Sequence, residues 1–266
     1  MAKIDPEKCV VCLQCIPYCP MNAIMHGENR VYIDQEACVE CAICIRSRAC
    51  KVDAIFMPEL SWPRSIRAMF SGGGVGYGPK GRDTIDYSYI TGKVGLPRRS
   101  PEQVRSQGRA SGGTVEMKSN DVTWRFREGE IGVACELGRP AVGFYFRDLE
   151  KVSSTLAKHR VQFERQNPVS VLIDPHTGAI KQEYEEVKDE KALRGIIEMR
   201  VKNEEAAIHV LQDLKVVAGE IETVFSVDVI SRCKNGEVPI KKQLERAGMN
   251  VLINGKTCIG LGRKIL

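Results

Sequence analysis

A run of closely spaced cysteines occurs twice near the start of the chain, and it constrains the fold more than any other feature. KIDPEKCVVCLQC (3–15) matches YIDQEACVECAIC (32–44) at Ile, Asp, Glu and three cysteines, at a displacement of 29 residues. CPMNAI (19–24) matches CKVDAI (50–55) at Cys, Ala and Ile, now at a displacement of 31 residues. The second copy is therefore an intact repeat with two residues inserted between its third and fourth cysteines.

The first copy reads C-x2-C-x2-C-x3-C-P and resembles the run of bacterial ferredoxins with two [4Fe-4S] clusters. The resemblance covers residues 1–57 and implies a ferredoxin domain there. In this family the fourth cysteine of each run binds the cluster of the other run. The resemblance therefore implies two ligand sets: Cys9, Cys12, Cys15 and Cys50 for the first cluster, and Cys38, Cys41, Cys44 and Cys19 for the second.

Zinc is the main alternative for these eight cysteines, because paired C-x-x-C motifs also build four-cysteine zinc sites. Such a site takes two cysteines from each knuckle, which would leave the third cysteine of each triplet and Cys19 without a role. We therefore favour two cubane clusters over zinc or structural thiols. If the insertion kept Cys50 from reaching its cluster, that cluster would be three-iron or labile. Two extra loop residues cost little, so we expect Cys50 to bind.

The inserted stretch also carries positive charge. Arg46 and Arg48 precede Cys50, and Lys51 follows it where proline is usual in the motif. We expect these charges close to the first cluster, where they either favour its reduced, more negative state or form a docking surface for an acidic partner. The alternative is that they are solvated loop charges with little effect.

Cysteine usage also bears on the compartment. The chain has 11 cysteines, but its start, MAKIDPEKC, lacks the pattern of a secretory signal peptide. Thiolates in a reducing compartment are therefore expected rather than disulfides. The sequence contains no run of about eighteen apolar residues, so we expect no transmembrane helix. These observations predict a soluble, cytoplasmic protein.

Residues 58–128 are the least regular part of the sequence. They hold eleven of the 24 glycines and twelve basic against seven acidic residues. No helical or strand period persists there, apart from a possible turn of helix at RSIRAMF (64–70). The aromatic residues in this segment favour an arm that wraps a partner, because disordered linkers are usually poor in aromatics. GYGPKG (76–81) fits G-x-G-x-x-G but lacks the flanking strand and helix of a nucleotide site. The basic excess is too dilute to predict nucleic-acid binding.

The remaining residues, 129–266, have the pattern of an α+β domain. Strands are expected at 130–138, 169–174, 193–201 and 223–231, and helices at 147–160 and between Asn203 and Gly219. The order β-α-β-β-α-β is that of ferredoxin-like sandwiches, which share only a name with the cluster domain, and it is similar to ACT-type ligand-sensing modules. A further helix at 240–248 and a hairpin at 250–260 complete the expected fold.

The α+β domain shows no catalytic constellation such as H-E-x-x-H or G-x-S-x-G. Surface or packing roles are expected for its three histidines: His159, His176 and His209. Its three cysteines lack ligand-like spacing, which favours lone buried thiols over a third metal site: Cys135, Cys233 and Cys258.

These features predict an electron-transfer protein or subunit without a catalytic site of its own. Two [4Fe-4S] clusters would pass low-potential electrons to or from a larger redox enzyme, which the arm and the α+β domain would grip. One alternative is a redox-responsive regulator whose ACT-like domain binds a small metabolite. Another is an accessory protein in sulfur or cofactor assembly.

Overall fold

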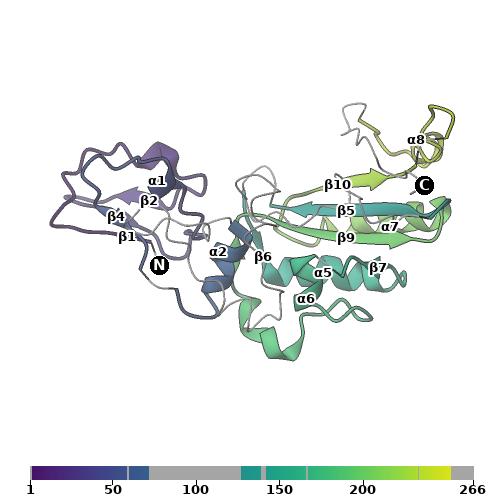
Figure 1. Cartoon of the computed structure of the whole chain (residues 1–266), viewed down its shortest axis with the longest axis horizontal. Coiled ribbons are helices and arrows are strands. Elements are labelled where there is room, and N and C mark those ends of the chain that lie inside the picture. The colour runs from purple at the N-terminus through teal and green to yellow at the C-terminus, as the bar shows by residue number, and fades with distance from the viewer. Residues whose placement is uncertain are drawn as a thin grey trace, which may run out of the picture. The chain divides into compact units, whose positions relative to one another are not determined.

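The computed structural model describes residues 2–58, 60–71, 127–138, 142–165, 167–232 and 234–252 (Figure 1). Most of the expected arm at 58–128, including GYGPKG, and most of the expected hairpin at 250–260 lie outside these residues. The chain divides into two compact units, which are described separately. The first unit combines the N-terminal region with residues 138–146 and 185–195, and the second takes in 147–184 and the residues from 196 onward.

The cysteine-rich part of the first unit contains two small antiparallel ribbons. Strand β1 (Lys3–Ile4) pairs with β4 (Ile55–Phe56), and β2 (Ile24–His26) pairs with β3 (Val31–Ile33). Alternation along β3 explains its orientation, because its first and third residues are buried while the residue between them is exposed. The ribbons thus direct short aliphatic side chains inward.

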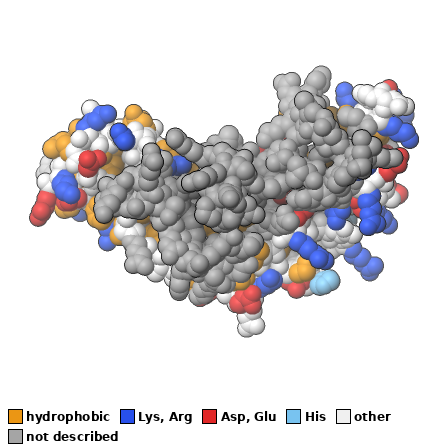
Figure 2. Space-filling model, viewed as in Figure 1, with side chains coloured by type: hydrophobic (Ala, Val, Ile, Leu, Met, Phe, Trp, Pro, Cys, Tyr) orange, Lys and Arg blue, Asp and Glu red, His pale blue; other side chains and the backbone are white. Residues whose placement is uncertain are grey.

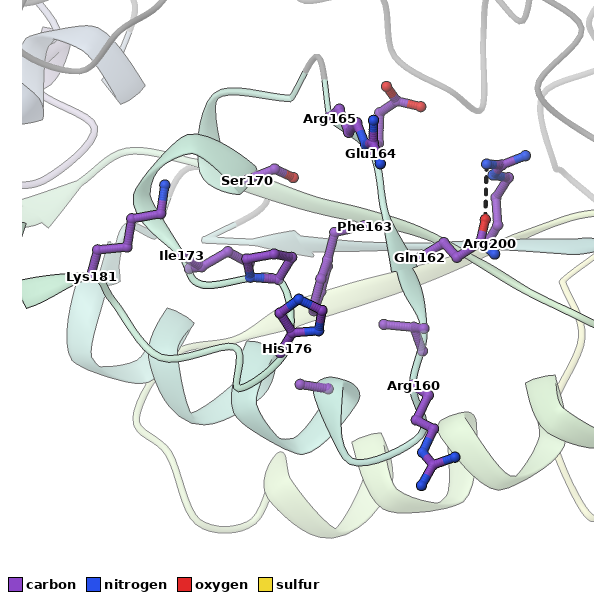
Figure 3. Close-up of a pocket in the computed structure, with 13 residues that line it drawn as sticks. Arg160, Gln162, Phe163, Glu164, Arg165, Ser170, Ile173, His176, Lys181 and Arg200 are labelled. Carbon is purple, nitrogen blue, oxygen red and sulfur yellow. Dashed lines mark hydrogen bonds between the residues drawn. The ribbon is translucent and has the colours of Figure 1, made fainter.

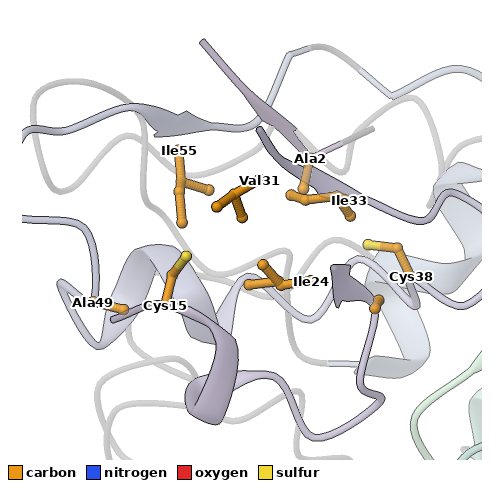
Figure 4. Packing of buried hydrophobic residues seen from close by; sticks show 9 residues of the cluster. Ala2, Cys15, Ile24, Val31, Ile33, Cys38, Ala49 and Ile55 are labelled. Carbon is orange, nitrogen blue, oxygen red and sulfur yellow. The ribbon is translucent and has the colours of Figure 1, made fainter. Parts of the chain in front are cut away.

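A small core joins these ribbons to the cysteine loops. The side chains of Ile24, Val31, Ile33 and Ile55 converge on the same interior as Cys15 and Cys38 (Figure 4). A short helix lies at the third cysteine of each run: the 3-10 helix η1 (Ile16–Tyr18) begins directly after Cys15, and α1 (Ile43–Arg46) contains Cys44. The repeated cysteine run therefore lies against the aliphatic core.

A second layer of the first unit is built around helix α2 (Ser65–Ser71). The sequence indicated only a possible turn of helix here, yet almost every residue of α2 is buried, Arg67 included. The helix packs against the two-stranded sheet of β6 (Phe144–Tyr145) and β8 (Lys191–Ala192). Phe70 of α2 meets the Phe146 ring edge-to-face, with the ring centroids 5.3 Å apart.

The second unit contains a four-stranded sheet in the order β10-β5-β9-β7. The bounds of its strands are β5 Ile131–Leu137, β7 Gln162–Phe163, β9 Gly195–Val201 and β10 Phe225–Ile230. Strands β10, β5 and β9 lie side by side in Figure 1. Every residue of β5 is buried, as expected for a central strand. Three of the four expected strands are therefore present near their predicted positions.

The expected strand at 169–174 is wrong, because this stretch begins as helix α6 (Pro168–Leu172). The Asn167 side chain accepts a hydrogen bond from the Val169 backbone N–H, and Pro168 occupies the first turn. Both features favour a helix start. A short apolar run has no period that distinguishes the two structures. The second strand of the sheet is instead β7, directly after the first helix of the domain.

The expected helices are present with small shifts of their ends. Helix α5 (Phe146–Ala157) ends before the expected residue 160, where Arg160 has a left-handed backbone with φ of 53°. Helix α7 (Glu204–Val217) begins at Asn203, whose side chain accepts from the Ala206 N–H. Helix α8 (Lys241–Arg246) lies within the predicted range. This mixed content of helix and strand agrees with the α+β class, and none of the described helices has the length and apolar character to cross a membrane.

Candidate metal centres

The loops that carry the first three cysteines of each copy have the same unusual backbone. The middle cysteine is flanked on both sides by residues with positive φ: Val11 (52°) and Leu13 (62°) around Cys12, and Glu40 (55°) and Ala42 (54°) around Cys41. Each non-glycine residue in this region costs about 1–2 kcal/mol, and a β-branched residue such as Val11 is rarely found there. Backbone strain of this kind persists only where the surroundings hold it and is concentrated at functional sites.

The fourth cysteine of each copy has the same hydrogen bond to its sulfur, despite the insertion before Cys50. The Ala23 N–H donates to the Cys19 sulfur at 3.2 Å, and the Ala54 N–H donates to the Cys50 sulfur at 3.1 Å. Within the inserted stretch, Arg48 has a positive φ of 52° and no counterpart in the first copy. The two extra residues are therefore accommodated before Cys50, whose local structure matches that of Cys19.

Four cysteines meet around one small cavity, and we call them the first cysteine set: Cys9, Cys12, Cys15 and Cys50. The rest of the lining is apolar and includes Val10, Leu13 and Val52. Burial raises the pKa of Cys15, and the neighbouring thiols of Cys50, Cys12 and Cys9 raise it further. This mutual influence requires the four sulfurs to lie near one another.

The other four cysteines form a second cysteine set: Cys19, Cys38, Cys41 and Cys44. Burial, followed by the nearby thiols of the other three, raises the pKa of Cys44 to about 12. This set is the more buried one, since Cys38 and Cys41 are each 9% exposed whereas Cys12 of the first set is exposed. Leu193, from the distant stretch 185–195, packs in one cluster with Cys41. The four cysteines of the second set thus lie near one another, as those of the first set do.

An unpaired donor lies beside the second set. The buried Nε of Arg46 has no hydrogen-bond partner among the described residues. Burial raises the pKa of Cys41, and the Arg46 charge opposes that rise, so the guanidinium is near this thiol. We expected Arg46 beside the first set, but α1 carries it to the second. A buried donor without an acceptor next to four thiols fits a site that receives a group rich in sulfur acceptors.

Within the described parts of the chain, no three His, Cys, Asp or Glu side chains converge closely enough to hold a single metal ion. A cubane is larger than a single ion, so its four thiolate ligands lie farther apart than the ligands of one ion. Cys135 is completely buried in β5 of the second unit, and Cys233 and Cys258 lie outside the described residues. His159 contacts Asp213 with 2.8 Å between Nε2 and Oδ2, and His176 and His209 are exposed.

Sequence reasoning missed the contacts that hold the second loop. Glu40 is completely buried, and its Oε1 accepts from Nε of Arg64 at 2.8 Å. Arg67 of α2 donates to the Cys38 carbonyl at 2.8 Å and pairs with Glu190. The one available signal was an acidic residue at position 40, where the first copy has Val11.

The second unit has a separate open cavity of about 1060 Å³ beside the edge strand β7. Its floor is partly apolar, with Phe163 and Ile173 among the lining residues. The Phe163 and His176 rings lie toward its middle in Figure 3. Four basic side chains surround it there: Arg160, Arg165, Lys181 and Arg200. Glu164 is the acidic residue of the lining, and Arg200 also pairs with Glu130 at 3.4 Å.

The comparisons with known proteins match a segment of the chain and not its whole length. A family model described as a 4Fe-4S binding domain matches residues 2–25. A protein named Ferredoxin 7Fe from Hydrogenibacillus schlegelii is 35% identical over 73 residues, which are 25% of this chain and 90% of that protein. Ferredoxin-3 from Chlorobaculum tepidum is 46% identical over 44 residues, 16% of this chain and 71% of that protein.

Pyruvate synthase subunit PorD from Methanocaldococcus jannaschii is 43% identical over 53 residues, which are 20% of this chain and 59% of that subunit. No solved structure matches the chain. The chain thus covers 90% of one ferredoxin at 35% identity, and the family model matches residues that include the first cysteine run. Through this N-terminal segment, the chain belongs to the ferredoxin family.

Proposed function

We propose that the chain is an electron-transfer protein or subunit that exchanges low-potential electrons with a larger redox enzyme. The first cysteine set would hold one [4Fe-4S] cluster and the second set another. When bound, each cluster supplies a centre that takes up and releases one electron at a time. The observation that carries this proposal is the convergence of eight cysteines into two groups of four, each drawn from both copies of the repeat.

The protein's own residues would bind the clusters and control their surroundings. The thiols lose their protons on binding, so the ligand set releases protons as it is loaded. Backbone N–H groups of Ala23 and Ala54 donate to the sulfurs of the two fourth cysteines, and such hydrogen bonds tune cluster potentials. The apolar core around the sets limits the access of water.

The first cysteine set is the better placed of the two for exchange with a partner. Cys12 is exposed, and the apolar side chains of Val10 and Leu13 beside it are 64% and 39% exposed. On the visible face of the first unit, hydrophobic side chains are mixed with charges of both signs (Figure 2). Arg48 and Lys51 are exposed near Cys50 and would favour an acidic partner surface.

The partner proposed is a cytoplasmic oxidoreductase or a complex of that kind. The likeness to Pyruvate synthase subunit PorD supports this, because the name of that relative places it in an enzyme complex. The segment 58–128 and the second unit would grip the partner. No catalytic centre of the chain's own is proposed.

Anaerobic purification of the full chain tests the cofactor content. The protein should contain about eight iron and about eight acid-labile sulfide per chain. A preparation that holds zinc alone and keeps its native fold would overturn the proposal. Stoichiometric co-purification with an oxidoreductase from anaerobic native extract, together with electron transfer between the two, would support the role as a carrier.

A second candidate function is a redox-responsive regulator whose ACT-like second unit binds a small metabolite. The cavity beside β7 favours this candidate, because its basic rim and partly apolar floor suit an anionic compound with an apolar part. Calorimetric titration of the full chain with amino acids and phosphorylated metabolites tests it. Arg165→Gln should weaken any such binding, whereas the same change at Arg48, in the other unit, should not. A chain that binds none of these compounds would argue against the regulator.

A further inference from the structure

The two cysteine loops differ at one equivalent position. Val11 and Glu40 occupy the same place in the repeat, 29 residues apart, and both have a left-handed backbone. Val11 is apolar, whereas Glu40, which stands between Cys38 and Cys41 in the sequence, carries a carboxylate. A carboxylate with 0% exposure is costly unless it is paired. The second loop therefore needs partners that the first loop does not.

Those partners come from outside the repeat. Oε1 of Glu40 accepts from Nε of Arg64 at 2.8 Å, and Oε2 accepts from the backbone N–H of Ala2 at 3.0 Å. Both carboxylate oxygens are thus satisfied. Arg64 keeps 15% of its side chain exposed and Glu40 none, so the pair is largely removed from water. Charge-assisted hydrogen bonds in such a setting are strong and fix geometry.

Two guanidinium groups also hold the backbone of the second loop. Arg64 donates to the Gln35 carbonyl at 2.6 Å, and Arg67 donates to the Cys38 carbonyl at 2.8 Å. Arg67 is itself 4% exposed and pairs with Glu190 from the stretch 185–195. Among the described residues, no arginine makes a corresponding contact with the loop of Cys9 and Cys12. We call these contacts of Arg64 and Arg67 with the second loop the arginine clamp. The first loop has no such clamp among the described residues.

The charges of this clamp lie next to a cysteine of the second set. Glu40 follows Cys38 by two residues, and Arg64, besides pairing with Glu40, donates to the Cys38 carbonyl at 3.5 Å. A cluster held by Cys38 would be exposed to the same two charges. Adding an electron to a cluster is disfavoured by a nearby negative charge and favoured by a positive one.

We propose that Arg64 and Arg67 are positioning residues for the second cysteine set, and that Arg64 neutralises the buried Glu40 carboxylate and so keeps that carboxylate from lowering the reduction potential of the second cluster. This inference rests on the proposed function. It makes the two centres inequivalent although their cysteine motifs are nearly the same. It also assigns a role in the second centre to the start of the segment that follows the ferredoxin motifs.

Three variants of the full chain test the proposal by anaerobic redox titration followed by electron paramagnetic resonance. Arg64→Gln leaves Glu40 buried without its cation, so the midpoint potential of the second cluster should fall or that cluster should be lost. Glu40→Gln removes the negative charge, so the midpoint should rise. The double variant loses both charges, so its midpoint should return toward the wild-type value. In all three variants, the first cluster should keep its signal and its potential.

The controls separate the clusters and the hypotheses. The Cys50→Ser variant identifies the signal of the first cluster, and Arg48→Gln, an exposed arginine in the same domain, should leave the second-cluster midpoint unchanged. Equal shifts of both signals in Arg64→Gln, or no shift in either single variant, would overturn the clamp. If the Arg64→Gln variant lacks the second cluster, the direction in which the second-cluster midpoint shifts in Glu40→Gln still tests the proposal. Wild-type protein without any cluster would instead refute the proposed function, which keeps the two failures distinguishable.

Discussion

Replacing Cys50 with serine tests whether the stretched second copy still supplies a ligand. The structure places Cys50 at the cavity shared with Cys9, Cys12 and Cys15, and the Ala54 N–H donates to its sulfur at 3.1 Å. Serine keeps the shape of the side chain but replaces a soft thiolate ligand with a hydroxyl. The first cluster should therefore be damaged, while the second should survive because none of its ligands changes.

The expected size of the effect follows from the composition of the clusters. Two intact cubanes hold about eight iron per chain. Loss of the whole first cluster would leave about four, and loss of a single iron from it would leave about seven. Iron and sulfide analysis, with electron paramagnetic resonance of oxidised and reduced samples, distinguishes the two outcomes.

Matched variants make this experiment decisive. Cys19→Ser alters the equivalent position of the other copy and should damage the second cluster instead. Cys135→Ser alters a buried thiol of the second unit and should leave the iron content unchanged. If Cys50→Ser has the iron content and spectra of wild type, Cys50 is not a ligand, and the assignment of the first set fails.

Three further predictions concern the stability of the second unit, measured by urea denaturation. Complete burial raises the pKa of the Cys135 thiol above its ordinary 9.0, so the stability it contributes is complete below pH 9 and is lost as the pH rises toward the raised pKa. The free energy of unfolding should fall more steeply above pH 9 in wild type than in Cys135→Ala, and equal slopes would contradict this. Asp148→Ala removes the acceptor of two hydrogen bonds from Thr223, at 3.1 and 2.7 Å, and should cost about 2–3 kcal/mol, more than Thr223→Val, which keeps the backbone bond. Gly178→Ala would bring a Cβ within 2.2 Å of a backbone oxygen of α5, whereas Gly129→Ala has the same left-handed backbone in open space. The second change should cost about 1–2 kcal/mol and the first clearly more, and similar losses would refute the steric argument.

Local sequence signals predicted most of the elements of the second unit. Asn203 marks the start of α7 because its side chain can accept from a helical N–H, and this cap is present. The apolar run 131–137 is a buried strand, as predicted. The prediction failed at 169–174, where a short apolar run follows Asn167 and Pro168. Its length and composition fit a strand and a helix equally well, and the capping contact with Val169 decides the outcome.

The sequence by itself determined the repeat, the eight candidate ligands and the place of the insertion. The cysteines of one run are only a few residues apart, so they belong to the same loop and their spacing can be read directly from the sequence. Only the tertiary structure showed that Arg46 lies near Cys41, and that the second loop is clamped by Arg64 and Arg67. The partners of this clamp are separated by 24 residues for Glu40 and Arg64 and by 123 for Arg67 and Glu190. No local period relates residues so far apart. Their contacts form because a buried carboxylate and a buried guanidinium are stable only when folding brings opposite charges to them.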